Sequence, residues 1–345
     1  MPPTPSLSIV IPIYNEPAWI GRVVNDARAA IRAAPFSPVE FVIVDDGSDE
    51  PTRQVLDGIA AGDPTVRVVR QENAGRFAAR RRGIEEARGE LVLLLDSRVS
   101  LRPDALRFVA DALEADPAKR IWNAHVDVEL SGNPYARFWN VLTEVAFRDY
   151  FEDPRTTSYG LEEFDRYPKG TTCFIAPRAD LLDAIASFSS HYPDVRHAND
   201  DTLLIRNLAS RHRVNISPGF SCVYRGRNAL RPFLRHTRHR GVVFVDGFLR
   251  PGSRFLLPLL AFYPATLVAA AGALRRPRAT LRLLPLVPAA WAAFAVGFRR
   301  GPKDVATMAV LGPPWMVAYG IGLWRGGLAV LRNWIRRQWR KATQP

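Results

Sequence analysis

Val42-Ile-Val-Asp45-Asp46-Gly47-Ser48 and Leu93-Leu-Leu-Asp96-Ser97-Arg98 are the two stretches that decide the fold. In each of them a run of aliphatic residues ends in carboxylates. Such runs are typical of strands that are buried on both faces of a parallel sheet, and ligands of open α/β sheets bind beyond the carboxyl ends of the strands. We therefore expect Asp45, Asp46 and Asp96 to meet at one crevice, where three acids suit a ribose, a base edge or a metal-bound diphosphate.

Strands and helices alternate over the first hundred residues. The hydrophobic patterns predict strands at 7–14, 40–44, 66–69 and 90–95, and helices at 19–33, 52–61 and 76–87. This alternation predicts a doubly wound α/β domain with a mostly parallel sheet. Neither a G-x-G-x-x-G pattern after the first strand nor a P-loop pattern is present. The main signature of a dinucleotide-dependent dehydrogenase is therefore missing from the sequence.

The excess of positive charge is confined to the C-terminal part of the chain. The formal net charge is +13, yet the residues up to 245 contain 32 basic and 32 acidic side chains, whereas residues 246–345 contain 15 basic and only 2 acidic ones. The same part holds uncharged stretches at 255–274, 283–298 and 305–324, separated by arginine clusters. About 20 residues cross a bilayer as a helix. A basic, apolar tail predicts contact with anionic lipid headgroups rather than with nucleic acid.

The sequence therefore predicts a catalytic domain at 1–245 and a basic, membrane-associated helical region at 246–345. The alternative is a hydrophobic subdomain packed on the core, although a buried soluble helix of this length normally keeps a polar face. Both loops between the apolar stretches are basic, which the positive-inside rule disfavours for three full crossings. Because prolines also interrupt the stretches, we expect a membrane hairpin with one further segment in the interface.

Two observations bear on the compartment. The N-terminus runs into the first strand without a basic start or an apolar signal core. The two cysteines, Cys173 and Cys222, form neither a metal-ligand spacing nor a disulfide framework. Both observations fit a reducing cytoplasm, so we expect the catalytic domain on the cytoplasmic face of the membrane.

Four motifs follow one another along the first hundred residues. They are Pro12-Ile-Tyr14-Asn15-Glu16, Asp45-Asp46-Gly47-Ser48-x-Glu50, Asn73-Ala-Gly75-Arg-Phe-Ala-Ala-Arg80-x-x-Gly83 and Leu95-Asp96-Ser97-Arg98. In this order they resemble the signature of family 2 glycosyltransferases with the GT-A fold. The apolar C-terminal third is similar to the membrane-embedded tails of bacterial members that build exopolysaccharide or glycosylate lipid carriers. The resemblance implies a nucleoside diphosphate sugar, UDP- or GDP-linked, as the donor.

The resemblance also implies which residues border that donor. They are Pro12, Tyr14, Glu16, Asp45, Asp46, Gly75 and Arg80, with the last two in a loop near the diphosphate. A turn with a helix cap is the alternative for Asp45-Asp46-Gly47-Ser48, but capping explains one acid and not a pair at a buried strand end. Arg80 either pairs with phosphate oxygens or shares a solvated helix face with Arg81 and Arg82.

Asp96 occupies the first acid of the family's D-x-D motif. There it would contact the ribose and a divalent ion that bridges the diphosphate, Mg²⁺ or Mn²⁺, a task suited to a carboxylate. The third position of the motif is Arg98, and a guanidinium cannot bind a metal. Either Asp96 holds the ion with a ligand from elsewhere, such as His236 or His239, or Arg98 supplies positive charge itself. We expect a retained Mg²⁺ or Mn²⁺.

His197-Ala-Asn199-Asp200-Asp201-Thr-Leu-Leu204 resembles the acidic pair that precedes a helix and contains the family's catalytic base. The match places the base at Asp201, with Asp200 as its partner. An attacking hydroxyl becomes acidic only as the new bond forms, so a positioned carboxylate must take its proton. The alternative is an acidic N-terminus for a helix at 202–208, favoured by the helix dipole; both roles are compatible.

The segment Arg235-His236-Thr-Arg238-His239-Arg240-Gly241 is basic throughout. It matches the place where family members carry a segment that closes over the diphosphate leaving group, which gives His236, His239 and Arg240 a role in stabilising the departing charge. The alternative is a cytoplasmic-face patch that meets anionic lipid.

These features together predict an inverting glycosyltransferase. Its acceptor would be a lipid-linked glycan or a polyprenyl-phosphate at the cytoplasmic membrane face, with a soluble acceptor as the alternative. A nucleotidyltransferase would carry a Gly/Arg/Lys-rich loop after the first strand, where this chain has Tyr14-Asn15-Glu16. A non-catalytic membrane scaffold is hinted at by Arg98 and opposed by the presence of Asp201.

Overall fold

The computed structural model describes residues 4–343 of the chain, which form two compact units. The first unit comprises the residues up to Glu129 together with Asp149–Ser189 and Asp200–Arg225. The second comprises Leu130–Arg148, Ser190–Asn199 and the chain from Gly226 onward. The boundary at 245 that the sequence predicts between a catalytic and a membrane-associated part stays a prediction.

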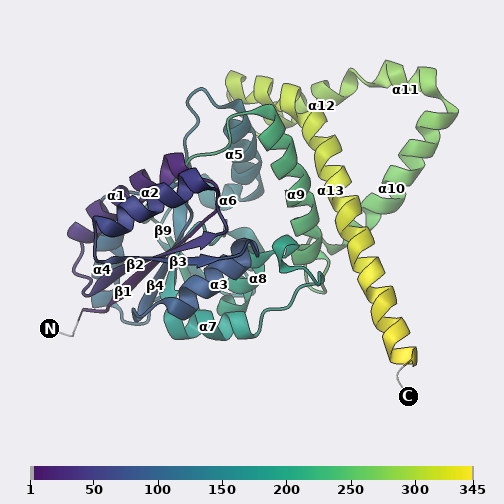
Figure 1. Ribbon diagram of the computed structural model, residues 1–345. Helices are drawn as coiled ribbons and strands as arrows, with labels where there is room; N and C mark the ends of the chain where they lie inside the picture. Colours follow the sequence, from purple (N-terminus) through teal and green to yellow (C-terminus); the bar gives the residue numbers. More distant parts are fainter. Residues whose placement is uncertain (1–3, 344–345) are drawn as a thin grey trace. The chain divides into compact units, whose positions relative to one another are not determined.

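A mixed sheet organises the first unit (Figure 1). Its strands are β1 (Leu7–Ile13), β2 (Val39–Asp46), β3 (Val66–Gln71), β4 (Leu91–Leu95), β5 (Val99–Leu101), β6 (Trp122–Val128), β7 (Thr157–Tyr159), β8 (Cys173–Pro177) and β9 (Val214–Tyr224). They lie in the order β3-β2-β1-β4-β8-β6-β9-β5, and β7 pairs with β9. The first four strands are parallel, and β8 joins β4 in the antiparallel sense.

Helices cover both faces of this sheet, as Figure 1 shows. They are α1 (Pro17–Arg32), α2 (Glu50–Ala61), α3 (Arg76–Glu86), α4 (Ala105–Ala115), α7 (Arg178–Ala186) and α8 (Asp200–Ala209). The short η1 (Phe164–Arg166) lies in a connecting segment of the first unit, α6 (Arg148–Phe151) begins at the last residue of a second-unit segment, and η2 (Val195–His197) belongs to the second unit. Alternate residues of each strand face opposite sides: Ile9 and Ile11 join the core under α1, α2 and α4, whereas Val10 joins the core under α3, α7 and α8. The predicted doubly wound α/β fold is confirmed.

The second unit is helical. Its helices are α5 (Pro134–Ala146), α9 (Leu230–Phe248), α10 (Leu256–Arg275), α11 (Pro277–Leu283), α12 (Leu286–Gly297) and α13 (Pro302–Thr343). Phe138 of α5, Phe233 of α9 and Met308 of α13 share one buried cluster. An ion pair at 2.9 Å between Arg137 and Asp304 joins α5 to the first turn of α13.

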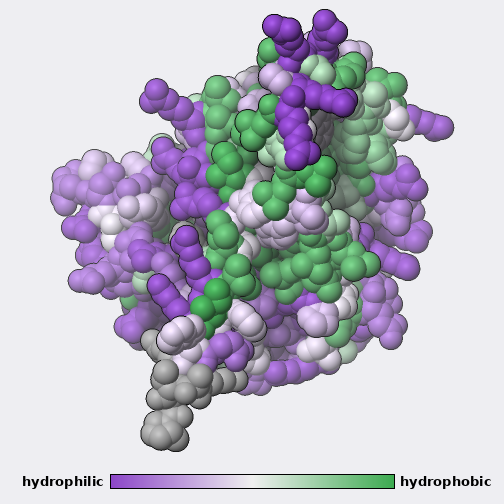
Figure 2. All heavy atoms as spheres, turned by 90° about the vertical axis from the view of Figure 1, so that its right-hand side faces the viewer, coloured by the Kyte–Doolittle hydropathy of each residue, from purple (hydrophilic) through white to green (hydrophobic). Residues whose placement is uncertain are grey.

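The C-terminal helices expose their apolar side chains. Leu256–Arg275, Pro277–Gly297 and Pro302–Trp339 are long and apolar enough, by length and composition, to cross a membrane. Leu257, Val268 and Leu274 are each more than 70% exposed, and Figure 2 shows hydrophobic side chains gathered on the face that these helices form. The long apolar helices predicted from the sequence are confirmed, whereas their orientation in a bilayer stays a prediction.

Observed boundaries differ from the expected ones by a few residues in the first hundred positions. The second strand, for example, extends to Asp46 rather than ending at Val44. Strands β5 to β9 were not expected individually, and all five take part in antiparallel pairs. Both cysteines are buried and free.

Gly83 is where α3 approaches the sheet most closely. A Cβ atom there would lie 2.3 Å from Val10 Cγ1 and 3.1 Å from Val44 Cγ2. We expect Gly83→Ala to lower the free energy of unfolding by about 1–3 kcal/mol, because the core must shift to admit a methyl group. Denaturant or thermal unfolding measures this.

Gly58→Ala is the matched control, because an added Cβ at Gly58 of α2 meets no atom of the described residues within 4 Å. It should leave stability unchanged or raise it by about 0.5–1 kcal/mol. Equal unfolding midpoints for the two variants would contradict the packing of α3 against β1 and β2.

Candidate active site

The acids singled out in the sequence follow the carboxyl ends of neighbouring parallel strands. Asp46 ends β2, Asp96 follows β4, and the loop with Tyr14 and Glu16 follows β1, which lies between those two strands. Pro12 lies within β1 and pairs with Val44. The sheet thus brings these residues to one edge, as expected from its topology.

Asp46 is buried and holds the loop before α3. Its carboxylate accepts hydrogen bonds from the Gln71 side chain at 2.7 Å and from the backbone N–H groups of Ala74 and Gly75 at 2.9 Å each. Gly75 has φ +91°, a left-handed conformation that favours glycine. Asp46 therefore fixes the shape of the loop that the resemblance assigns to the diphosphate.

Asp45 is equally buried but makes different contacts. It accepts the backbone N–H of Ser48 at 2.9 Å, and Arg70 lies 3.8 Å from its other oxygen. The helix cap of α2 is Asp49, whose side chain accepts from the Thr52 N–H. The turn-and-cap alternative thus explains the local bonds of Asp45 and Asp49, but not the contacts of Asp46.

Arg80 is the centre of the acidic cluster. Its side chain is only 4% exposed. Nη2 donates to Asp96 at 2.6 Å, and Nη1 donates to Asp200 and to Asp201, also at 2.6 Å each. One guanidinium of α3 therefore joins the end of β4 to the first turn of α8. The solvated-face alternative is wrong for Arg80, whereas Arg81 and Arg82 are exposed and pair with Glu85 and Glu86.

Two further side chains complete this cluster. Arg76 donates to Asp200 at 2.7 Å and to Asp201 at 3.3 Å, and the Thr171 hydroxyl donates to Asp201. Burial alone lowers the pKa of Arg80, but the charges of the neighbouring carboxylates outweigh burial and raise this pKa above its ordinary value. Arg80 thus stays charged. Asp200 and Asp201 lie in the first turn of α8, where the helix dipole also stabilises their negative charges.

Arg98, which replaces the second acid of D-x-D, pairs with Glu16 through Nε at 2.8 Å. Its guanidinium lies 6.0 Å from the centre of the Trp19 ring. Asn15 belongs to the first motif but was given no role in the sequence analysis. It joins the loops after β1 and β2 by accepting the Asp49 N–H, while its own N–H donates to the Ser48 hydroxyl. Beside it, Tyr14 is 51% exposed and offers an aromatic face to solvent.

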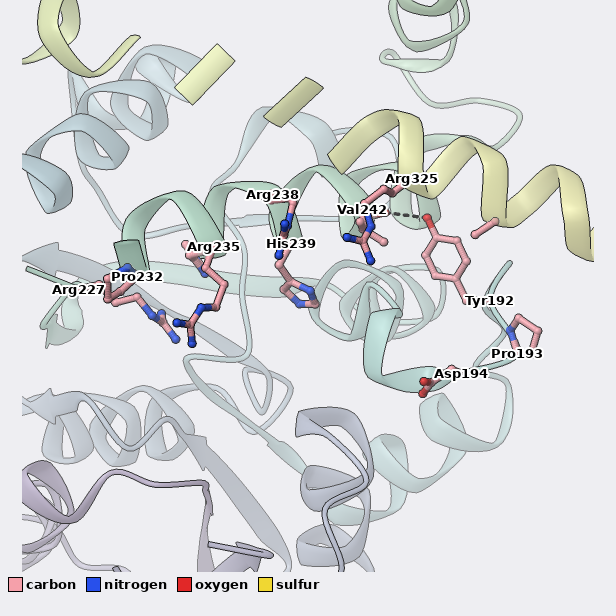
Figure 3. A pocket seen from close by; sticks show the side chains of 12 residues that line it. Tyr192, Pro193, Asp194, Arg227, Pro232, Arg235, Arg238, His239, Val242 and Arg325 are labelled. Atoms are coloured by element: carbon pink, nitrogen blue, oxygen red, sulfur yellow. Dashed lines mark hydrogen bonds between the residues drawn. The ribbon is translucent and has the colours of Figure 1, made fainter. Parts of the chain in front are cut away.

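The residues expected at the leaving group belong to α9 in the second unit. His236 and His239 line a cavity there, and Figure 3 labels His239. Arg240 is not among the residues that line this cavity, and its guanidinium lies 5.5 Å from the centre of the Trp139 ring. Across the described residues, no group of three or more His, Cys, Asp or Glu side chains is arranged to hold a metal.

Sequence reasoning named the acids and Arg80 but missed how they are joined. Arg76 and Thr171 were not assigned to the acid pair, and Asp246 was overlooked. Asp246 is fully buried on α9 and accepts from the Ser190 hydroxyl and from the N–H groups of His191 and Asn199, at 2.7–2.9 Å. The only sequence signal for Asp246 was an isolated acidic residue just before the apolar C-terminal stretches.

Comparison with known proteins agrees with this geometry. Residues 8–182 match the family model described as glycosyl transferase family 2. The chain is 31% identical over 156 residues to the undecaprenyl-phosphate 4-deoxy-4-formamido-L-arabinose transferase of Pseudomonas fluorescens strain SBW25, which covers 43% of this chain and 45% of that protein. It is 33% identical over 101 residues to the putative glycosyltransferase EpsH of Bacillus subtilis, covering 29% and 28% respectively. The chain thus spans less than half the length of either relative.

Among solved structures, the mannosyltransferase PcManGT of Pyrobaculum calidifontis, in complex with GDP-Man and Mn²⁺, has a TM-score of 0.56 and 19% sequence identity. The match covers 94% of this chain and 88% of that one. The likeness concerns the fold, which is of the GT-A type with long apolar helices after it.

Removing Arg80 tests the centre of the cluster. Arg80→Met leaves three carboxylates near one another without their shared partner, so we expect a loss of about 3–5 kcal/mol in the free energy of unfolding. Arg81→Met is the control, because its exposed pair with Glu85 contributes about 0.5 kcal/mol or less. Denaturant titration of both variants distinguishes them, and a small effect at Arg80 would contradict the bridging role.

Proposed function

Because this chain belongs to glycosyltransferase family 2, we propose that it transfers a sugar from a UDP- or GDP-sugar to a lipid-linked acceptor at the membrane surface. The observation that carries the proposal is the Arg80-centred cluster of Asp96, Asp200 and Asp201 at the carboxyl edge of the sheet. Family membership removes the nucleotidyltransferase alternative.

We assign the donor to the loops at this edge. Tyr14 is exposed and suits stacking against a base. The loop that Asp46 holds presents Gly75 and the N-terminus of α3, and helix N-termini bind phosphate through their N–H groups. Asp96 is the carboxylate assigned to the ribose and the diphosphate. Pro12, Asp45 and Glu16 support this edge.

Asp201 is assigned as the general base, with Asp200 as its partner. In the proposed step an acceptor oxygen attacks the anomeric carbon while the bond to the diphosphate breaks. A hydroxyl acceptor passes its proton to the Asp201 carboxylate, whereas a phosphate acceptor attacks as the anion and transfers no proton. In both cases the nucleoside diphosphate leaves with the electron pair of the broken bond, and the configuration inverts. Arg80 and Thr171 fix the orientation of Asp201 through hydrogen bonds before substrate arrives.

A lipid-linked acceptor is supported by two independent features. Long apolar helices of the second unit expose their side chains, and a relative named as an undecaprenyl-phosphate sugar transferase aligns with part of the chain. An acceptor delivered at a cytoplasmic membrane face is then a polyprenyl-phosphate or a glycan attached to one. Transfer of labelled sugar to lipid-extractable product, rather than to a soluble glycan, tests this assignment.

The residues at this edge fit a Mg²⁺ or Mn²⁺ ion whose other ligands would come from the substrate phosphates. Asp96 is a single carboxylate, and Mg²⁺ commonly uses one or two carboxylates plus substrate phosphates. The arginines around it are engaged: Arg80 and Arg76 by the acid cluster and Arg98 by Glu16. Little arginine charge is therefore left to neutralise a diphosphate, so a bound cation would supply that charge.

The first functional prediction concerns the base. Asp201→Asn keeps the shape of the side chain but removes its proton affinity, so turnover should fall by about 10²-fold or more while donor binding survives. Asp183→Asn is the control, because the Asp183 side chain of α7 is exposed, and this variant should keep full turnover. Product NMR should report inversion at the anomeric carbon; a retained configuration would refute the mechanism.

The second functional prediction concerns the metal. Exhaustive chelation should abolish transfer, and added Mg²⁺ or Mn²⁺ should restore it. Asp96→Ala should abolish transfer even with metal present, because the assigned carboxylate is lost. Full activity after chelation would instead mean that arginines alone neutralise the diphosphate.

A further inference from the structure

The second unit contains a cavity of about 570 Å³ between α9, α13 and the segment around Tyr192. Arginines surround it. Arg227 precedes α9, Arg235 and Arg238 lie on α9, and Arg325 lies on α13. Figure 3 shows the side chains of Arg227 and Arg235 reaching toward each other from the chain at the start of α9. The cavity is therefore a basic pocket, which we call the arginine pocket.

None of the four arginines forms an ion pair with an acid of the described chain. Arg137 and Arg300, by contrast, both pair with Asp304. Asp194 on the pocket wall pairs with Arg196 at 2.9 Å. Like charges that converge without a counter-charge are unfavourable, so this arrangement suits an anionic ligand. Guanidinium groups bind phosphate oxygens with two parallel hydrogen bonds.

The pocket lies where an apolar helix becomes polar. Arg325 is the first charged residue after the uncharged stretch at 305–324, and it follows Trp324. Tryptophan and arginine at the end of such a stretch are typical of the headgroup level of a bilayer. The phosphate of a membrane lipid is the anion found at that level.

Close packing of two helices builds the pocket. A Cβ atom on Gly322 would lie 2.2 Å from the Arg238 carbonyl oxygen, and one on Gly241 would lie 2.4 Å from that of Tyr319. These glycines let α9 and α13 cross with their backbones in contact. Arg238 lies at this crossing, and Arg325 follows Gly322 by about one turn of α13, so the same contact holds both.

The opposite wall is also fixed. The Tyr192 hydroxyl donates to the Val242 carbonyl oxygen at 2.8 Å, as the dashed line in Figure 3 shows. Asp246 holds the flanking His191 and Asn199 through their N–H groups. The wall is thus tied to α9 at several points, which favours a shaped binding site over a diffuse basic surface.

We propose that the arginine pocket binds the phosphate or diphosphate group of the polyprenyl-linked acceptor. The inference rests on the proposed function and adds to it the place where the acceptor's charged end is held. Arg235 and Arg325 are its main ligands, because they approach from the two different helices that cross at Gly241 and Gly322.

The test measures binding of radiolabelled undecaprenyl phosphate to the full-length chain in phosphatidylcholine vesicles. The double variant Arg235→Gln/Arg325→Gln should bind it about tenfold or more weakly, since two charge-assisted contacts are lost. The control Arg332→Gln/Arg336→Gln removes equal charge from exposed positions of α13 outside the pocket and should bind normally. Arg235→Lys/Arg325→Lys should lie between the two, because lysine keeps the charge but loses the two-bond geometry.

Three outcomes would overturn the proposal. Equal weakening by both double glutamine variants, or equal competition by phosphatidylglycerol, would mean a general attraction to anionic lipid. A loss of nucleoside diphosphate binding with lipid binding intact would assign the pocket to the leaving group. If the wild-type chain transfers sugar to lipid but the pocket variant still binds lipid normally, the role of the pocket is refuted and the proposed function stands. If the wild-type chain transfers sugar only to a soluble acceptor, the proposed function itself is refuted.

Discussion

The bridge from Arg80 to three carboxylates is the contact on which the candidate active site depends. Three acids near one another repel, and buried charges persist only when they are paired and hydrogen-bonded. Arg80 meets this requirement by reaching from α3 to the end of β4 and to the first turn of α8. The same contact therefore sets the distance between the carboxylate assigned to the donor and the carboxylate assigned as base.

A separate ion pair accounts for a departure from the family pattern. Arg98 stands where a second acid is expected, yet its guanidinium is paired with Glu16 at the neighbouring strand end. The substitution thus adds a local ion pair rather than a free positive charge. Asp96 remains the carboxylate of that motif, and its contact with Arg80 keeps it oriented. In the proposed function, a divalent ion would be shared between Asp96 and the substrate phosphates.

Much of the fold could be predicted from the first hundred residues. Their aliphatic runs have the length and continuity of buried parallel strands, and parallel strands end at one edge, so the positions of Asp46 and Asp96 followed. The partners of Arg80 did not follow, because 120 residues separate it from Asp200. Arg80, Arg81 and Arg82 are identical in type, and only packing of α3 against the sheet decides which of them is buried.

Asp246 holds the segment that carries one wall of the arginine pocket and that continues into Asp200 and Asp201. Asp246 holds both ends of the segment 190–199 by accepting from Ser190, His191 and Asn199. A side chain at Gly247 would collide with Asn199, since a Cβ atom there would lie 2.0 Å from Nδ2. The segment carries the pocket wall at Tyr192, and Asp200 is the next residue after Asn199. The segment that carries the wall of the proposed acceptor pocket therefore runs directly into the proposed catalytic pair, so chain continuity links the two halves of the proposed reaction.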